Sequence, residues 1–238
     1  MRKDKNLWEK SPLSKIRIFL VIFNYFFGYM FFYPSLLVKF TFWIDPNASS
    51  IPPFYEFVVY TLVILITIVL LWPLLKVTWT VFKKMDKVMI LKTVGKSYLL
   101  MLGCNLIINL LITMITNSST SMNQVGVEES LKATPLLITF ATLCFAPIVE
   151  EGVFRGAIFR PLRSKYCFYI AAIVSSLCFG FIHIYSSLLS GNFHDLLYLF
   201  SYAVVGFFTC RVYEKTGNLS SSMLFHFFNN LLAVLVIL

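Results

Sequence analysis

Seven long apolar runs alternate with short polar or basic segments along the chain. Each run comes close to the roughly 20 residues that an α-helix needs to cross about 30 Å of hydrocarbon. The pattern therefore predicts an all-α fold, a polytopic membrane helix bundle of about seven transmembrane helices. The predicted spans are approximately 18–38, 55–78, 98–116, 135–158, 167–185, 196–210 and 219–238.

The composition also indicates a membrane protein, because 58% of the 238 residues are hydrophobic and only 13% are charged. A water-soluble domain of this size needs a more highly charged surface. The five cysteines lie in or beside apolar runs without C-x-x-C spacing. We therefore expect no disulfide or cysteine metal site, and we predict that the cysteines are small buried apolar residues.

The charge distribution predicts the orientation in the membrane. The chain carries 20 Lys and Arg against 11 Asp and Glu, and the basic residues gather in segments 1–17, 83–96, 160–165 and 211–215. Because basic residues favour cytoplasmic loops, we expect a cytoplasmic amino terminus and infer no nucleic-acid partner. The first apolar run is bulky and no small-residue cleavage site follows it, so it is expected to remain as a membrane helix. The predicted location is the cell membrane, as in multi-pass proteins of the bacterial cytoplasmic membrane.

The fourth apolar run contains three ionisable residues, Glu150, Glu151 and Arg155. A charged residue at membrane depth costs roughly 2.5–3.5 kcal/mol on insertion scales, so three together indicate a site with partners on neighbouring helices. Glu151 and Arg155 are four residues apart and share a helix face, whereas Glu150 is turned by about a quarter circle. The alternative to a functional site is a structural ion pair that holds one helix against another. That alternative leaves one carboxylate unpaired, because the run contains two acidic residues and one basic residue.

Two later runs offer polar partners for these carboxylates. The fifth run carries His183 after the small residues Ser175, Ser176 and Gly180, which allow a neighbouring helix to approach closely. The seventh run carries His226 and Asn230, four residues apart on one helix face. Each of these residues alone is more typical of a hydrogen bond between helices, but together they predict one shared site.

The three groups resemble the signature motifs of the CPBP intramembrane proteases. That family includes CAAX prenyl endopeptidases and bacterial bacteriocin-processing or self-immunity (Abi) proteins. The resemblance extends over residues 136–230 and rests on Glu150-Glu151-x-x-x-Arg155, Phe179-x-x-x-His183 and His226-x-x-x-Asn230. It implies a CPBP-type intramembrane protease in which Glu150 and His183 activate a water molecule. His226 and Asn230 would complete the site as oxyanion stabilisers or metal ligands.

This interpretation divides the chain into a cytoplasmic basic tail (1–17), three amino-terminal transmembrane helices (18–134) and a four-helix catalytic core (135–238). The expected substrate is a peptide or a lipidated peptide within the lipid bilayer. Two cofactor alternatives stay open. Zinc could be held by Glu150, His183 and His226, although the three ligands lack the local H-E-x-x-H spacing, or the same residues could act without a metal.

The alternative function is a non-proteolytic one. A bacteriocin self-immunity or regulatory membrane protein could use the same fold to bind another membrane protein. In that case the motif residues would matter for stability alone.

Overall fold

The computed structural model describes residues 12–237, so most of the predicted amino-terminal tail lies outside the described residues. Within this range the chain is helical without strands, and seven helical spans are long and apolar enough to cross a membrane. The predicted polytopic helix bundle is confirmed. The spans are Lys15–Ile44, Pro53–Lys84, Lys87–Thr116, Pro135–Arg163, Phe168–Leu189, Phe193–Thr216 and Leu219–Ile237.

Some spans consist of several helical segments. The first contains α2 (Lys15–Phe23), the π-helix η1 (Asn24–Phe32) and α3 (Tyr33–Ile44). The fourth contains α7 (Pro135–Phe140), η2 (Ala141–Phe145), α8 (Ala146–Glu151), η3 (Gly152–Phe159) and α9 (Arg160–Arg163). The remaining elements are α4 (Pro53–Lys84), α5 (Lys87–Thr116), α6 (Met122–Ala133), α10 (Phe168–Leu189), the 3-10 turn η4 (Phe193–Leu197), α11 (Tyr198–Thr216) and α12 (Leu219–Ile237).

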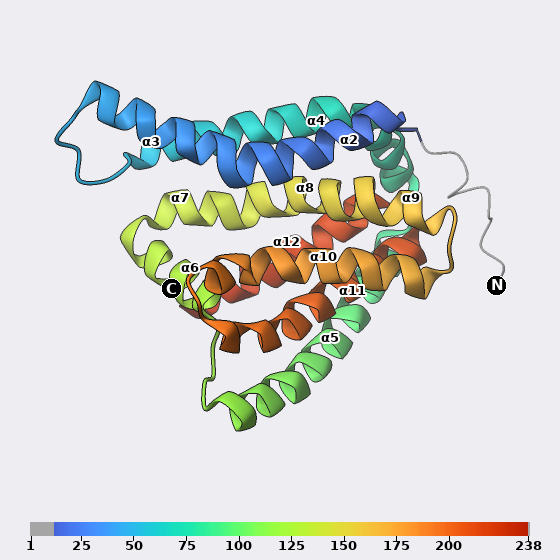
Figure 1. Cartoon of the computed structure of the whole chain (residues 1–238). Helices are drawn as coiled ribbons and strands as arrows, with labels where there is room; N and C mark the ends of the chain where they lie inside the picture. The colour runs from blue at the N-terminus through green and yellow to red at the C-terminus, as the bar shows by residue number, and fades with distance from the viewer. Residues whose placement is uncertain (1–11, 238) are drawn as a thin grey trace.

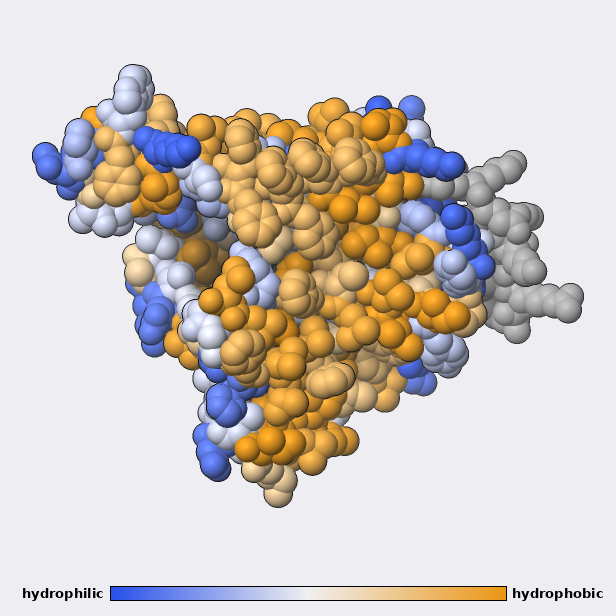
Figure 2. Space-filling model, in the orientation of Figure 1, coloured by the Kyte–Doolittle hydropathy of each residue, from blue (hydrophilic) through white to orange (hydrophobic). Residues whose placement is uncertain are grey.

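The surface has the polarity that a bilayer requires. Figure 2 shows apolar residues over the middle of one face and hydrophilic residues gathered at its two ends. Large apolar side chains such as Phe19, Leu99 and Ile173 are at least half exposed on this surface. Since lipid tails are as apolar as these side chains, their exposure carries no hydrophobic cost in a membrane.

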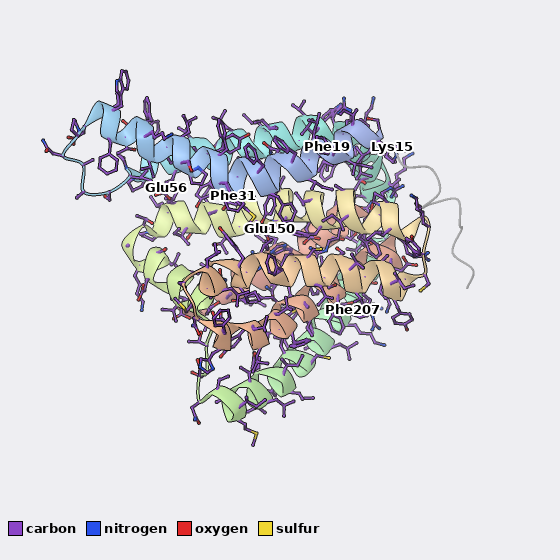
Figure 3. The ribbon with its side chains drawn as sticks, in the orientation of Figure 1. Lys15, Phe19, Phe31, Glu56, Glu150 and Phe207 are labelled. Carbon is purple, nitrogen blue, oxygen red and sulfur yellow. The ribbon has the colours of Figure 1, made fainter. Side chains whose placement is uncertain are left out.

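The spans are layered, with α2, α3 and α4 on one side of the fourth span and α10, α11, α12 and α5 on the other (Figure 1). Helices α10 and α11 approach closely at Gly180, where an added Cβ would lie 2.7 Å from the backbone oxygen of Leu199. This confirms the predicted role of the small residues on the fifth span. Figure 3 shows Lys15 and Glu56 toward opposite ends of the bundle, with Glu150 between them.

Two sequence predictions need correction. The polar segment between the third and fourth spans is not a simple connection but contains helix α6, whose first turn is capped by the Ser121 side chain accepting from the Gln124 N–H. The cysteines were predicted to be buried, but Cys104, Cys144 and Cys167 are exposed and Cys210 alone is fully buried among the described residues. A small apolar residue on a membrane helix can face lipid as readily as protein, which explains the error.

Candidate active site

The two adjacent glutamates lie on α8, a short α-helical segment between two π-helical segments. Pro147 stands near the start of α8, and Gly152 begins η3. A π-helical turn contains one more residue than an α-helical turn, and such insertions are frequent at functional sites. The π-helical turns also change the direction in which the following side chains point.

A buried ion pair joins Glu151 and Arg155, as their spacing predicted. Glu151 Oε1 lies 3.0 Å from Arg155 Nη1, and neither side chain has any exposed surface. The guanidinium also donates a hydrogen bond from Nη2 to the carbonyl of Gly206 at 2.9 Å and lies over the Phe179 ring, 4.7 Å from its centroid. These contacts offset the cost of burying the charge and connect the fourth span to α10 and α11.

His226 lies between the two carboxylates. Its Nδ1 donates a hydrogen bond to Glu151 Oε1 at 2.8 Å, because an ionised carboxylate can only accept. The Nε2 nitrogen faces Glu150 and lies 3.9 Å from its Oε2. Glu151 therefore sets the orientation of the imidazole that approaches Glu150, an arrangement in which a carboxylate selects the tautomer of a histidine.

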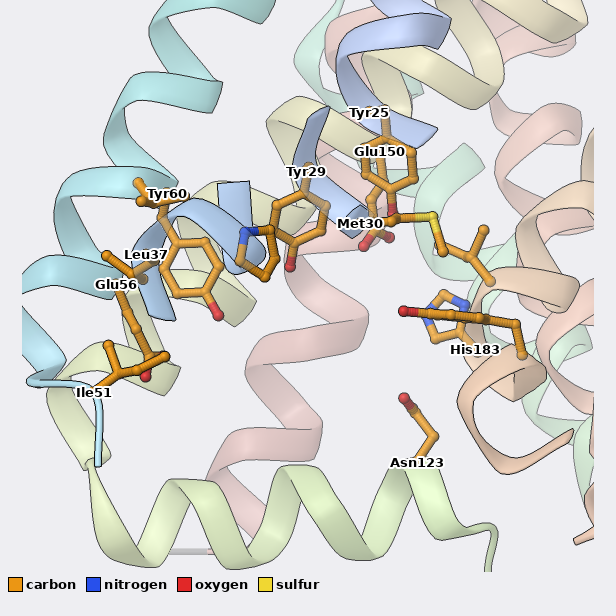
Figure 4. A pocket seen from close by; sticks show the side chains of 14 residues that line it. Tyr25, Tyr29, Met30, Leu37, Ile51, Glu56, Tyr60, Asn123, Glu150 and His183 are labelled. Atoms are coloured by element: carbon orange, nitrogen blue, oxygen red, sulfur yellow. The ribbon is translucent and has the colours of Figure 1, made fainter. Parts of the chain in front are cut away.

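Glu150 is the less buried of the two glutamates, and its Oε2 is the oxygen without a fixed partner. That oxygen has no hydrogen-bond partner among the described residues, and 12% of the side chain is exposed. Glu150 lines two cavities of about 360 and 540 Å³. Figure 4 shows the Tyr25 side chain beside it in the smaller of these cavities.

His183 lines both cavities together with Glu150. Its Nδ1 donates to the carbonyl of Phe179 at 2.9 Å, since a carbonyl oxygen can only accept. The ring stacks on Tyr202 with 4.6 Å between centroids. Among the described residues, His226 is the histidine within 4.0 Å of the Glu150 carboxylate. The predicted pairing of Glu150 with His183 therefore stays a prediction.

Asn230 lies one helical turn beyond His226 on α12. Its Nδ2 donates to the carbonyl of Thr142 in η2 at 2.8 Å, which connects the seventh span to the π-helical part of the fourth. Glu150, His183, His226 and Asn230 all line the larger cavity. The structure thus brings four predicted site residues from three spans to one cavity, with Glu151 and Arg155 packed behind them.

Zinc was one of two predicted cofactor alternatives, with Glu150, His183 and His226 as its ligands. Both histidines use Nδ1 for a hydrogen bond, which leaves each Nε2 for a metal or a proton. In the range that the structure covers, however, no three His, Cys, Asp or Glu side chains come together as a group that could hold a metal ion. Zinc held by Glu150, His183 and His226 therefore stays a prediction, as does the metal-free alternative.

Aromatic residues contribute more to the site than the sequence indicated. The Tyr202 hydroxyl shares a 2.7 Å hydrogen bond with Ser121 Oγ and accepts from Asn123 Nδ2 at 3.1 Å. Tyr202 thereby connects His183 to the start of α6. No tyrosine was predicted as a site residue, because the spacing of the tyrosines holds no signal that distinguishes a site residue from a core or interface anchor.

Comparison with known proteins bears on the same part of the chain. Residues 132–232 match the family model of the type II CAAX prenyl endopeptidase Rce1-like proteins. The predicted family resemblance is confirmed. This Rce1-like region, residues 132–232, contains every residue of the three sequence motifs and spans from the end of α6 into α12.

Two relatives extend the comparison. An uncharacterized protein of Mycoplasma capricolum subsp. capricolum is 31% identical over 166 residues, which are 66% of this chain and 46% of the relative. A Bacillus subtilis protein named "Putative membrane peptidase YdiL" is 30% identical over 116 residues, 49% of this chain and 43% of the relative. The matched part is thus less than half the length of each relative. No solved structure matches the chain. The Rce1-like region therefore relates this multi-pass membrane protein to membrane proteases at the level of the family.

Proposed function

We propose that this chain is an intramembrane endopeptidase of the cell membrane that hydrolyses peptide bonds in membrane-associated or short peptides. The observation that carries the proposal is the convergence of Glu150, His183, His226 and Asn230 on one cavity within the membrane-spanning bundle. The match of residues 132–232 to the Rce1-like family supports the same reaction class.

The hydrolytic step follows from the arrangement of Glu150 and His226. Because 3.9 Å separates Glu150 Oε2 from His226 Nε2, a water oxygen can lie about 2.8 Å from both atoms. Glu150 takes a proton from this water while the water oxygen attacks the carbonyl carbon of the peptide bond. The protonated Glu150 then delivers that proton to the departing amide nitrogen, so the C–N bond breaks and a carboxyl and an amino end form.

The other site residues hold the reacting groups in place. His183, with Nδ1 donating to the Phe179 carbonyl, offers Nε2 as an acceptor for the peptide N–H. Asn230 uses one N–H on Thr142 and has a second for the negative oxygen that develops on the attacked carbonyl. Glu151 and Arg155 act through His226 and are positioning residues.

The test uses the full chain reconstituted in nanodiscs with a library of quenched-fluorescent peptides. Glu150→Gln is expected to lower kcat by at least about 100-fold, because it removes the general base and leaves the shape unchanged. Glu129→Gln, on the exposed face of α6, is the matched control and should retain activity. Unchanged cleavage by Glu150→Gln would reject the mechanism. If motif variants instead lower membrane accumulation and biological function in parallel, the non-proteolytic alternative replaces it.

A further inference from the structure

The smaller cavity at Glu150 connects that carboxylate to a second one, Glu56. The cavity has a volume of about 360 Å³ and its wall includes Tyr25, Tyr29 and Tyr60. In Figure 4, Glu56 and Tyr60 lie toward one end, Tyr29 in the middle, and Glu150 toward the other end. A peptide with its scissile bond at Glu150 could therefore extend past the tyrosine rings to Glu56.

Glu56 lies in the first turn of α4 and is half-buried on the cavity wall. It makes no hydrogen bond or ion pair with any residue that the structure describes. An acidic residue in the first turn stabilises a helix through the helix dipole. That role does not require the side chain to line a cavity, whereas a carboxylate partly removed from water gains from a cationic partner.

The charge of the cavity walls favours such a partner. Among the described residues that line the two cavities at Glu150, none is Lys or Arg, while Glu56 and Glu150 are both acidic. A cleft lined by charge of one sign concentrates ligands of the opposite sign. Tyrosine rings add a favourable site for an ammonium or guanidinium group over their faces.

We propose that Glu56, with the rings of Tyr29 and Tyr60, forms a subsite for a Lys or Arg side chain of the peptide substrate. The proposal rests on the proposed function, since Glu150 at the other end of the cavity determines where the peptide bond lies. The fixed positions of Glu56 and Glu150 set the number of residues between the basic side chain and the bond that is cleaved.

The test compares peptides that carry Lys, norleucine or Glu at each position in turn, with the full chain in nanodiscs. Wild type should favour Lys at one position by roughly tenfold or more in kcat/KM. Glu56→Gln should remove this preference, so that kcat/KM for the Lys peptide falls to about the value for the norleucine peptide. Glu56→Lys should transfer the preference to the Glu peptide, which a purely structural role of Glu56 cannot produce. Glu129→Gln is the matched carboxylate control.

The outcomes separate the subsite from the proposed function. If wild type cleaves all peptides equally, or if Glu56→Gln lowers cleavage of all of them by one factor, the subsite is overturned and the endopeptidase stands. If wild type cleaves none, the endopeptidase fails. Binding of the same peptides to Glu150→Gln, measured by fluorescence anisotropy, then tests the subsite without turnover. Equal affinity for the Lys and norleucine peptides would overturn it.

Discussion

Replacement of Arg155 by alanine would leave the Glu151 carboxylate buried without its guanidinium partner. The two groups are 3.0 Å apart, and neither side chain has exposed surface. Removal of one partner from a buried ion pair costs about 3–5 kcal/mol of unfolding free energy. We expect the lower end of this range, about 3 kcal/mol, because His226 still donates a hydrogen bond to Glu151.

A second, partly exposed Arg–Glu pair with a similar closest distance provides the control. Arg163 Nη2 lies 2.9 Å from Glu214 Oε1, but 25% and 20% of these side chains are exposed. Because solvent screens such a pair, Arg163→Ala should cost about 1 kcal/mol or less. The free energy of unfolding of both variants can be measured by reversible denaturation in mixed micelles of increasing SDS content. Equal losses for the two variants would refute the argument from burial.

A double variant tests whether the loss of stability comes from the unpaired charge. Glu151→Gln combined with Arg155→Met removes both charges and leaves no uncompensated ion in the bundle. We expect it to be more stable than Arg155→Met alone, since the large cost comes from the unpaired charge. If the free energy of unfolding of the double variant falls by the sum of the losses in the two single variants, the two residues are not energetically coupled. An unpaired buried charge would then not explain the loss of stability in Arg155→Met.

The remaining predictions concern packing, cofactor and orientation. Gly180→Ala should destabilise the bundle by about 1–3 kcal/mol because its Cβ would meet the backbone of α11, whereas Gly103→Ala, with nothing within 4 Å of the added Cβ, should be neutral or slightly stabilising in the same unfolding assay. Peptide cleavage should survive treatment with 1,10-phenanthroline; loss of cleavage that Zn²⁺ restores would contradict the metal-free mechanism. In a chain without native cysteines, Asn123→Cys should react with an impermeant maleimide added to intact cells and Lys165→Cys should not. The opposite labelling would refute the predicted cytoplasmic amino terminus.

The sequence allowed the spans and the pairs within one span to be predicted because both depend on local physics. Hydropathy determines which segments enter the hydrocarbon, and the helical repeat places Glu151 and Arg155 on one face. Contacts between spans depend on the rotation of each helix about its axis. The π-helical segments η2 and η3 alter that rotation, and nothing in the residue pattern shows where they occur. The residue pattern therefore predicted that His226 shares a site with the glutamates, but not that its Nδ1 bonds Glu151 while its Nε2 faces Glu150.

Helix α6 shows a second limit of the sequence. Its residues are mixed in polarity and the apolar pattern predicts no span there, yet the structure anchors the helix through tertiary contacts. Asp195, in the turn η4, is buried and accepts hydrogen bonds from the Met122 N–H and from Ser187 Oγ. Asp195 and its neighbour His194 lie between the predicted fifth and sixth spans. A buried partner more than 70 residues away leaves no trace in local residue spacing.

The two cavities at Glu150 extend from this residue, in the middle of the fourth span, toward α6. Residues of the fourth span on the other side of Glu150, such as Val153, Phe154 and Phe159, are fully buried. Water can thus reach the middle of the membrane from one side and meets tight apolar packing beyond. For the proposed protease, this arrangement would supply the reacting water from the α6 side, while the described residues beyond Glu150 on the fourth span stay packed. Ion gradients across the membrane would then be preserved while the proposed hydrolysis takes place within the bilayer.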